Sequence, residues 1–235
     1  DDLFFRSSER FVRYVIEGLG DRPLDRYNSA DAAAFRDQLF EKGLSSSSVK
    51  RTFASIRSIV NLSIKEYGLS CENAFAQTFI PDRNDVIRRL PIPTTHLRLI
   101  QKACRSTDDD LRWLIALISD SGMRLAEAAG LLKADMELDH EIPHVSLKPH
   151  AWRQLKTANS ERVIPLVGTS LWAARRILEC TDTEFAFPRF TNETRCNSNS
   201  ASATLNEWMK PYIPDGCVIH SCRHSLRDRL RAVET

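Results

Sequence analysis

Prolines concentrated in one short segment are the feature that most constrains the fold of this 235-residue chain. Three of them fall within residues 81–93, where they are mixed with charged side chains of both signs. A proline inside a helix removes a backbone hydrogen bond and clashes with the preceding turn, so no long helix can cross this segment. The sequence on both sides has helical periodicity. The segment therefore predicts a helical domain over residues 1–80, a linker over 81–90 and a second domain over 91–235.

Apolar side chains in the first domain recur at the spacing of an amphipathic helix. The pattern follows a serine run suited to capping a helix N-terminus and consists of Val49, Phe53, Ile56, Val60 and Ile64. Lys50 and Arg57 lie two turns apart on a neighbouring face, which gives this helix a basic side. Similar spacings upstream, separated by a turn at residues 20–23, predict two more helices and hence a small helical bundle.

The second domain has mostly helical patterns and one pair of strand patterns. Residues 111–118 are apolar on nearly every side, which indicates a buried helix, and Ser121-Gly122 is a stop signal after it. Apolar stretches near residues 145–147 and 163–166 predict strands that flank a turn near 158–159. Further helical patterns lie near residues 97–100, 123–129, 170–178 and 203–209. We therefore expect a mainly α fold with a small antiparallel β-sheet, of the α+β class.

Positive charge is concentrated locally rather than spread over the chain. The formal net charge of +2 from 33 basic and 31 acidic residues does not by itself indicate a nucleic-acid binder. Residues 148–162 hold four Lys or Arg and one Glu, and residues 220–231 hold four Arg and one Asp, so each stretch carries a surplus of three positive charges. Clusters of this kind are typical of contacts to a phosphate backbone.

Three short motifs occur in a fixed order in the second domain. They are Ser-Gly-Met-Arg124-Leu-Ala-Glu127, then Leu-Lys156-Thr-Ala-Asn-Ser160-Glu-Arg162-Val-Ile-Pro-Leu166, then His220-Ser-Cys-Arg223-His224. Arg124 stands at the predicted start of a helix, where unpaired backbone N–H groups and the local dipole favour an anion. Taken singly, each motif is more often a solvated surface segment, and Glu127 is more often a structural partner than a proton-transfer group. The ordered combination is the specific signal.

The ordered motifs resemble those of the tyrosine recombinases of the phage integrase family. The resemblance covers the whole chain, because the first domain is similar to the helical, SAM-like core-binding domain of that family and the second to its catalytic domain. It implies a site-specific recombinase or integrase that cleaves and rejoins DNA strands through a 3′-phosphotyrosyl intermediate. It also implies double-stranded DNA as partner, a homotetramer on DNA, and no metal or other cofactor. The implied residues are Arg124, Lys156, His220 and Arg223 as catalytic, Glu127 and His224 as supporting, and Lys50, Arg57 and Arg162 as DNA-binding.

Transesterification at a phosphodiester gives these residue types a physical rationale. The transition state places extra negative charge on the non-bridging oxygens, and a planar guanidinium can donate two parallel hydrogen bonds to one phosphate. Arg124 and Arg223 suit that role. His220 has an ordinary pKa near neutrality, so it can donate to the phosphate or move a proton, and Lys156 can protonate the leaving 5′ oxygen.

The nucleophile is the part of the pattern that this sequence does not contain. In the family, the tyrosine follows the last motif, whereas the four tyrosines here are Tyr14, Tyr27, Tyr67 and Tyr212, all before His220. We therefore expect a nucleophile outside the 235 residues. Either the chain is cut short of it, which we favour, or the protein is a natural remnant that binds DNA without cleaving it.

Three classes of function remain open at this stage. The first is the recombinase, the second is a catalytically inactive DNA-binding regulator on the same fold, and the third is a helical protein-interaction module with basic patches. The ordered motifs count against the third. The start of the chain lacks the apolar centre of a signal peptide, and no apolar run approaches the roughly 20 residues needed to span a bilayer, so we expect a cytoplasmic protein.

Overall fold

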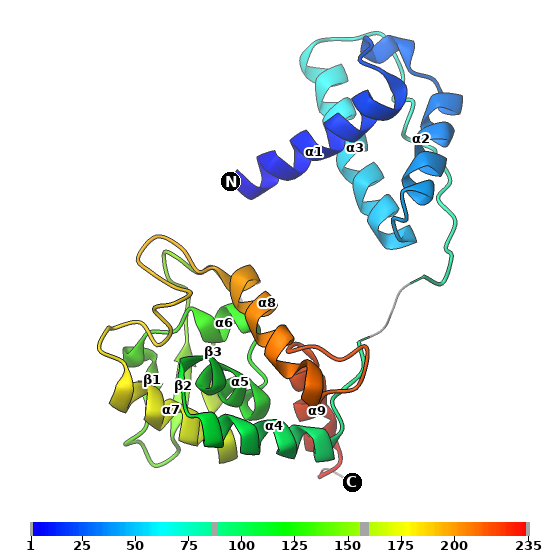
Figure 1. The fold of residues 1–235 in the computed structure, drawn as a ribbon. Helices are drawn as coiled ribbons and strands as arrows, with labels where there is room; N and C mark the ends of the chain where they lie inside the picture. The colour runs from blue at the N-terminus through cyan, green and yellow to red at the C-terminus, as the bar shows by residue number, and fades with distance from the viewer. Residues whose placement is uncertain (1, 86–88, 156–159, 234–235) are drawn as a thin grey trace. The chain divides into compact units, whose positions relative to one another are not determined.

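The chain forms two compact units in the computed structural model, which describes residues 2–85, 89–155 and 160–233. The first unit is Asp1–Ile87 and the second is Arg88–Thr235, so the division falls inside the proline-bearing segment (Figure 1). Each unit has a hydrophobic core of its own. The two are described separately below.

The described part of the first unit, residues 2–85, is a bundle of three helices, as the apolar periodicity predicts. These are α1 (Asp2–Leu19), α2 (Ser29–Glu41) and α3 (Ser46–Glu66), with a short 3-10 turn η1 (Leu24–Arg26) between α1 and α2 (Figure 1). The expected serine cap is confirmed, because the Ser45 side chain accepts a hydrogen bond from the backbone N–H of Ser48. Three aromatic rings fill the core, with centroids 5.6 to 6.3 Å apart, and they belong to Phe35, Phe53 and Phe75.

The second unit combines helices with a small antiparallel sheet (Figure 1), which confirms the expected fold class. Its helices are α4 (Thr94–Thr107), α5 (Asp110–Ser121), α6 (Leu125–Ala129), α7 (Gly168–Cys180), α8 (Ser198–Met209) and α9 (Ser221–Arg231), with 3-10 turns η2 (Lys133–Asp135) and η4 (Lys210–Tyr212). The strands are β1 (Met136–Glu137), β2 (His144–Leu147) and β3 (Arg162–Pro165), paired in the order β1-β2-β3.

The sheet differs from the sequence prediction in one strand and in its long connection. The two-residue strand β1 was not predicted, because it is too short to show an alternating pattern. Between β2 and β3, His150 and Arg153 form a tight turn through two backbone hydrogen bonds of 3.1 Å. The turn predicted near residues 158–159 lies outside the described residues.

Helix α5 is the central element of the second unit, as its apolar sequence predicts. Nine of its twelve residues are buried, and helices α4, α6, α7 and α9 contact it. Asp120 is one of the buried residues, and its carboxylate accepts hydrogen bonds from Arg229 of α9, Thr169 of α7 and Gln101 of α4, each 2.9 Å long. One side chain therefore ties three helices to the end of α5.

Gly122 ends α5 in the left-handed conformation, with φ of +63°, which confirms the predicted stop. A Cβ atom at this position would lie 2.7 Å from Cδ2 of Leu226 in α9. The carbonyl oxygen of Gly122 also accepts a hydrogen bond from Nη1 of Arg223. Both the backbone conformation and the close approach of α9 therefore require glycine here.

We predict that Gly122→Ala lowers the free energy of unfolding of the second unit by about 2 to 4 kcal/mol, from the left-handed backbone and the clash together. Gly216→Ala is the matched control in the same unit, because Gly216 has φ of +80° but nothing within 4 Å of an added Cβ. It should cost only the backbone strain, about 1 kcal/mol. Urea unfolding followed by circular dichroism measures both, and equal losses would contradict the role given to the α9 contact.

Candidate active site

The carboxylate of Glu127 is the centre of the candidate site and is almost fully buried, at 3% exposure. Its Oε1 accepts a hydrogen bond of 2.6 Å from Nη1 of Arg124, and its Oε2 accepts bonds from the Arg124 backbone N–H at 2.8 Å and from Nη2 of Arg162 at 2.9 Å. Burial acts to raise the pKa of Glu127, but the hydrogen bonds from Arg162 and Arg124 outweigh it and lower that pKa. Glu127 is therefore an ionised partner that holds two arginines, one from the start of α6 and one from β3.

Arg223 of α9 is the third arginine of this cluster. Burial lowers the pKa of its guanidinium, and the positive charges of Arg124 and Arg162 lower it further, while Glu127 raises it. Two guanidinium groups thus bind one carboxylate and a third acts on it electrostatically, which leaves a surplus of positive charge. The side chains of Arg124 and Arg162 remain 33% and 30% exposed, so donors of the cluster are open to an anion from solvent.

The sequence predicts that a helix N-terminus helps to attract an anion to this site, but in the structure its contribution is small. Helix α6 spans only five residues, and Arg124 occupies its N-cap position rather than its first turn. A helix this short has few aligned peptide dipoles. The attraction for an anion therefore comes from the arginine side chains.

Two histidines of the last motif lie at the start of α9 beside the arginines. The ring centroids of His220 and His224 are 5.3 Å apart. Burial lowers the pKa of His220 below its ordinary value of 6.5, and four neighbouring groups lower it further, namely His224, Arg89, Arg223 and Arg124. His220 is therefore neutral at pH 7 and can offer one N–H donor to a ligand.

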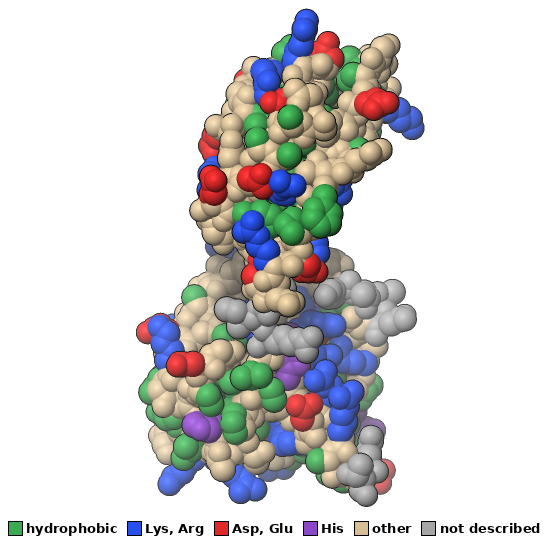
Figure 2. All heavy atoms as spheres, turned by 90° about the vertical axis from the view of Figure 1, so that its right-hand side faces the viewer, with side chains coloured by type: hydrophobic (Ala, Val, Ile, Leu, Met, Phe, Trp, Pro, Cys, Tyr) green, Lys and Arg blue, Asp and Glu red, His purple; other side chains and the backbone are tan. Residues whose placement is uncertain are grey.

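A groove of about 620 Å³ runs between β3 and α9 next to this cluster. Its polar lining includes Arg162, Arg223, His224, Arg227 and Arg231, and its apolar lining includes Val163, Ile164, Pro165, Leu226 and Leu230. Figure 2 shows a face of the second unit, in the lower half of the view, where Lys and Arg side chains gather beside a histidine. The surface around the site is thus suited to a polyanion.

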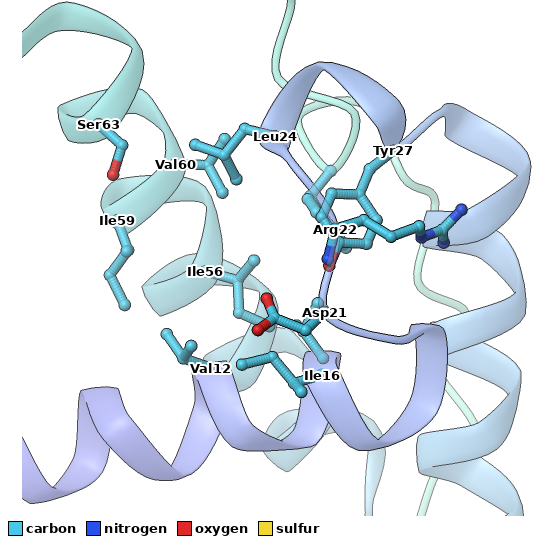
Figure 3. Close-up of a pocket in the computed structure, with 12 residues that line it drawn as sticks. Val12, Ile16, Asp21, Arg22, Leu24, Tyr27, Ile56, Ile59, Val60 and Ser63 are labelled. Atoms are coloured by element: carbon cyan, nitrogen blue, oxygen red, sulfur yellow. Dashed lines mark hydrogen bonds between the residues drawn. The ribbon is translucent and has the colours of Figure 1, made fainter. Parts of the chain in front are cut away.

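An apolar pocket lies elsewhere, in the first unit. It has a volume of about 220 Å³, and in it Val12 and Ile16 of α1 face Ile56 and Val60 of α3 (Figure 3). Its walls lack the clustered cations of the site in the second unit. Geometry and charge together therefore favour the arginine cluster as the functional site.

The structure brings together six of the predicted site residues within the second unit. Arg124, Glu127, Arg162, His220 and Arg223 interact with one another, and the ring of His224 meets that of His220 edge to face. Lys156 lies outside the described residues. Lys50 belongs to the first unit, where it is exposed and pairs with Asp82 at 3.1 Å.

Arg57 has an internal partner that the sequence does not reveal. Its Nε and Nη2 donate to the backbone carbonyls of Phe75 and Thr78 at 2.8 and 2.9 Å, so its guanidinium fastens the segment after α3 onto the helix. The basic face predicted for this helix is therefore partly structural. The basic segment 220–231 is also partly structural, because Arg229 is bound to Asp120 and to the Ser119 carbonyl. The sequence alone does not distinguish an arginine that faces the protein interior from one that faces solvent.

The described residues contain neither a group of metal ligands nor a helix that could span a membrane. No three His, Cys, Asp or Glu side chains are grouped there in a way that could hold a metal ion. None of the helices described has both the length and the apolar character needed to cross a membrane.

Comparison with solved structures identifies the fold. The integrase of the transposon Tn1549, in complex with transposon right end DNA, superposes with a TM-score of 0.72 at 18% identity, over 97% of this chain and 81% of that one. A lambda integrase dimer bound to a COC′ core site has a TM-score of 0.74 at 17% identity, over 100% of this chain and 65% of that one. A lambda integrase tetramer bound to a Holliday junction has a TM-score of 0.72 at 17% identity, over 100% and 66%.

Sequence comparison identifies the family. A search of curated proteins finds no match. The family model described as the phage integrase family matches residues 93–232, which is more than half of the chain and includes all three motifs. The chain therefore belongs to the phage integrase family of tyrosine recombinases.

Proposed function

We propose that this chain binds a phosphodiester of double-stranded DNA in the arginine cluster and promotes its transesterification, as part of a site-specific recombinase. The observation that carries the proposal is the cluster in which Arg124 and Arg162 bind the single buried carboxylate of Glu127 and Arg223 lies within electrostatic range of all three. Donors already held in place stabilise the charge that develops on phosphate oxygens without reorganising during the reaction. Glu127 supplies that preorganisation.

The proposed reaction is a transesterification in which each group of the site has one role. A tyrosine hydroxyl attacks the phosphorus, the bond to the 5′ oxygen breaks, and the products are a 3′-phosphotyrosyl link and a 5′-hydroxyl. Arg124 and Arg223 bind the non-bridging oxygens, and His220 donates one further hydrogen bond to them. Lys156 is the candidate donor of the proton that the leaving 5′ oxygen takes up, and the proton that the tyrosine hydroxyl loses passes to solvent, from which Lys156 is protonated again.

No tyrosine of this chain is assigned as the nucleophile. Tyr14, Tyr27 and Tyr67 belong to the first unit, where the hydroxyl of Tyr27 donates to the Gly20 carbonyl at 2.6 Å. The ring of Tyr212 packs on Trp208, with centroids 4.9 Å apart. We propose that the attacking tyrosine lies outside residues 1–235.

The organisation that we propose follows the family. Residues 1–80 are a core-binding domain that contacts the duplex, 81–90 a linker, and 91–235 the catalytic domain. The described relatives support this, because they are integrases bound to DNA, including a dimer on a core site and a tetramer on a Holliday junction. For this protein we propose a homotetramer on DNA, acting in the cytoplasm without metal or other cofactor.

The decisive experiment uses the full-length natural protein and a suicide DNA substrate that carries its own attachment site. A covalent protein–DNA complex on a denaturing gel, lost in Arg124→Ala and in Arg223→Ala, is the expected result. Binding to a verified site without any covalent product would instead support the alternative, a catalytically inactive DNA-binding regulator on the same fold.

We predict that duplex affinity falls steeply with salt and that Arg223→Ala lowers the slope of log K against log salt by about one, since one phosphate contact is lost. The control is Arg175→Ala, at an exposed position of α7 away from the cluster. Fluorescence anisotropy at a series of salt concentrations measures both variants. An unchanged slope in Arg223→Ala would argue against phosphate binding at this position.

We also predict a pH dependence of DNA binding that comes from His220. In the free protein its pKa is lowered, by burial and then by His224, Arg89, Arg223 and Arg124, whereas a phosphate beside it favours the protonated ring. Binding therefore takes up a proton, and affinity should rise as the pH falls from about 8 to about 6. His220→Gln should flatten this dependence, while the exposed-site control His140→Gln should keep it. A slope of the opposite sign would refute the assignment.

A further inference from the structure

Residues 82–85, which we call the strap, belong to the first unit and lie against the N-terminal end of α3. Oδ2 of Asp85 accepts hydrogen bonds from the backbone N–H of Ser46 at 2.7 Å and from the Ser46 hydroxyl at 3.0 Å. Nζ of Lys50, one turn further along α3, donates to Oδ2 of Asp82 at 3.1 Å. Both acidic side chains of the strap are therefore bound to the start of one helix.

The end of α3 that the strap covers attracts anions. The first backbone N–H groups of a helix have no partner within it, and the helix dipole places partial positive charge there. Helix α3 has no acidic residue in its own first turn. Lys50 adds a full charge on a side chain that is 47% exposed, and Arg51 lines a hollow of about 190 Å³ together with Arg10 of α1. Donors and cations suited to a phosphate therefore occur at the end of the helix to which Asp85 is bound.

Asp85 is held there as an anion. The hydrogen bond from the Ser46 backbone lowers its pKa, burial acts in the opposite direction, and the Ser46 hydroxyl and the charge of Arg83 lower it further. The backbone N–H of Arg83 also donates to the Ser46 hydroxyl at 3.0 Å, so the strap is fastened through both its backbone and a side chain. A carboxylate that accepts from a helix N–H makes the contact that a phosphate oxygen makes at such a place.

The strap is satisfied only in part. Oδ1 of Asp85 is buried and has no hydrogen-bond partner among the described residues. Asn84 has φ of +51°, in the left-handed region that side chains seldom adopt. The side chains of Lys50 and Asp82 are 47% and 72% exposed, and exposed ion pairs contribute little stability. A backbone phosphate of DNA, which offers its own acceptor oxygens to the same donors, can therefore displace the strap.

We propose that the strap is autoinhibitory: Asp82 and Asp85 occupy the N-terminal end of α3 in the manner of a DNA phosphate, and the duplex must displace them in order to contact this helix. The inference rests on the proposed contact between residues 1–80 and the duplex. It adds that the free protein competes with DNA for its own binding surface. The alternative is that the strap only fastens the chain to the bundle and stays in place when DNA binds.

The first test measures the affinity of the whole chain for a duplex that carries the attachment site, by fluorescence anisotropy. Asp82→Ala removes an exposed ion pair and should raise the affinity about threefold. Asp85→Ala removes two charge-assisted hydrogen bonds and should raise it about tenfold. The matched control for the Asp82→Ala/Asp85→Ala double variant is Asp25→Ala/Glu72→Ala, which removes two negative charges at exposed positions of the same unit. It should change the affinity less than about twofold.

The outcomes separate this inference from the proposed function. Equal gains in the two double variants would overturn the autoinhibitory role, because net charge alone would then explain them. Asp82→Ala covers the case in which Asp85→Ala does not fold, and an affinity of folded Asp82→Ala no higher than that of the unmodified chain would also overturn the role while leaving DNA binding intact. Absence of duplex binding in the unmodified chain and in every variant would refute the proposed DNA contact itself.

The second test follows the strap directly, through hydrogen exchange at the Arg83 amide in ¹⁵N-labelled protein. This N–H is bonded to the Ser46 hydroxyl while the strap is in place, so its exchange should accelerate when the strap is released. We expect faster exchange in Asp85→Ala without DNA, and in the unmodified chain once the duplex is added. Exchange in the DNA complex that is equal to or slower than that of the free chain would show that the strap stays bound, and the proposal would be wrong.

Discussion

The geometry of the site depends on the hydrogen bonds that the buried carboxylate of Asp120 accepts. At the last turn of the central helix α5, it binds Arg229 of α9, the start of α7 and Gln101 of α4. Two residues later, Gly122 turns the chain towards Arg124 and accepts a hydrogen bond from Arg223. The arginines of two motifs about a hundred residues apart meet because α9 is anchored at this point.

Local arrangement, and not total charge, makes this protein suited to a polyanion. A net charge of +2 over 235 residues gives almost no long-range attraction. Three guanidinium groups around one buried carboxylate concentrate positive charge where the donors are still partly exposed. The carboxylate also prevents the arginines from repelling one another out of position, so attraction for phosphate and fixed geometry come from the same group.

The sequence predicts most of the helices and the order of the site motifs, because these depend on local signals. The cap at Ser45, the stop at Gly122 and the buried α5 could each be recognised within one or two turns of sequence. The hydrogen-bond partners of individual arginine side chains could not be recognised from the sequence. Arg57 and Arg153 occur in stretches that look like solvated basic segments, yet one binds backbone carbonyls and the other is buried. Such assignments depend on which distant segment packs against the residue.

The entropy cost of binding a phosphate explains why a site of this kind keeps a buried carboxylate. A freely exposed arginine retains about 2 kcal/mol of rotamer entropy, which it loses when it closes on a phosphate. An arginine already held by Glu127 has lost that freedom during folding, so less is lost on binding. Glu127 must then be ionised although it is buried, and the hydrogen bonds from Arg162 and Arg124 lower its pKa despite the burial. The arginines therefore keep Glu127 charged, and Glu127 in turn fixes the arginines.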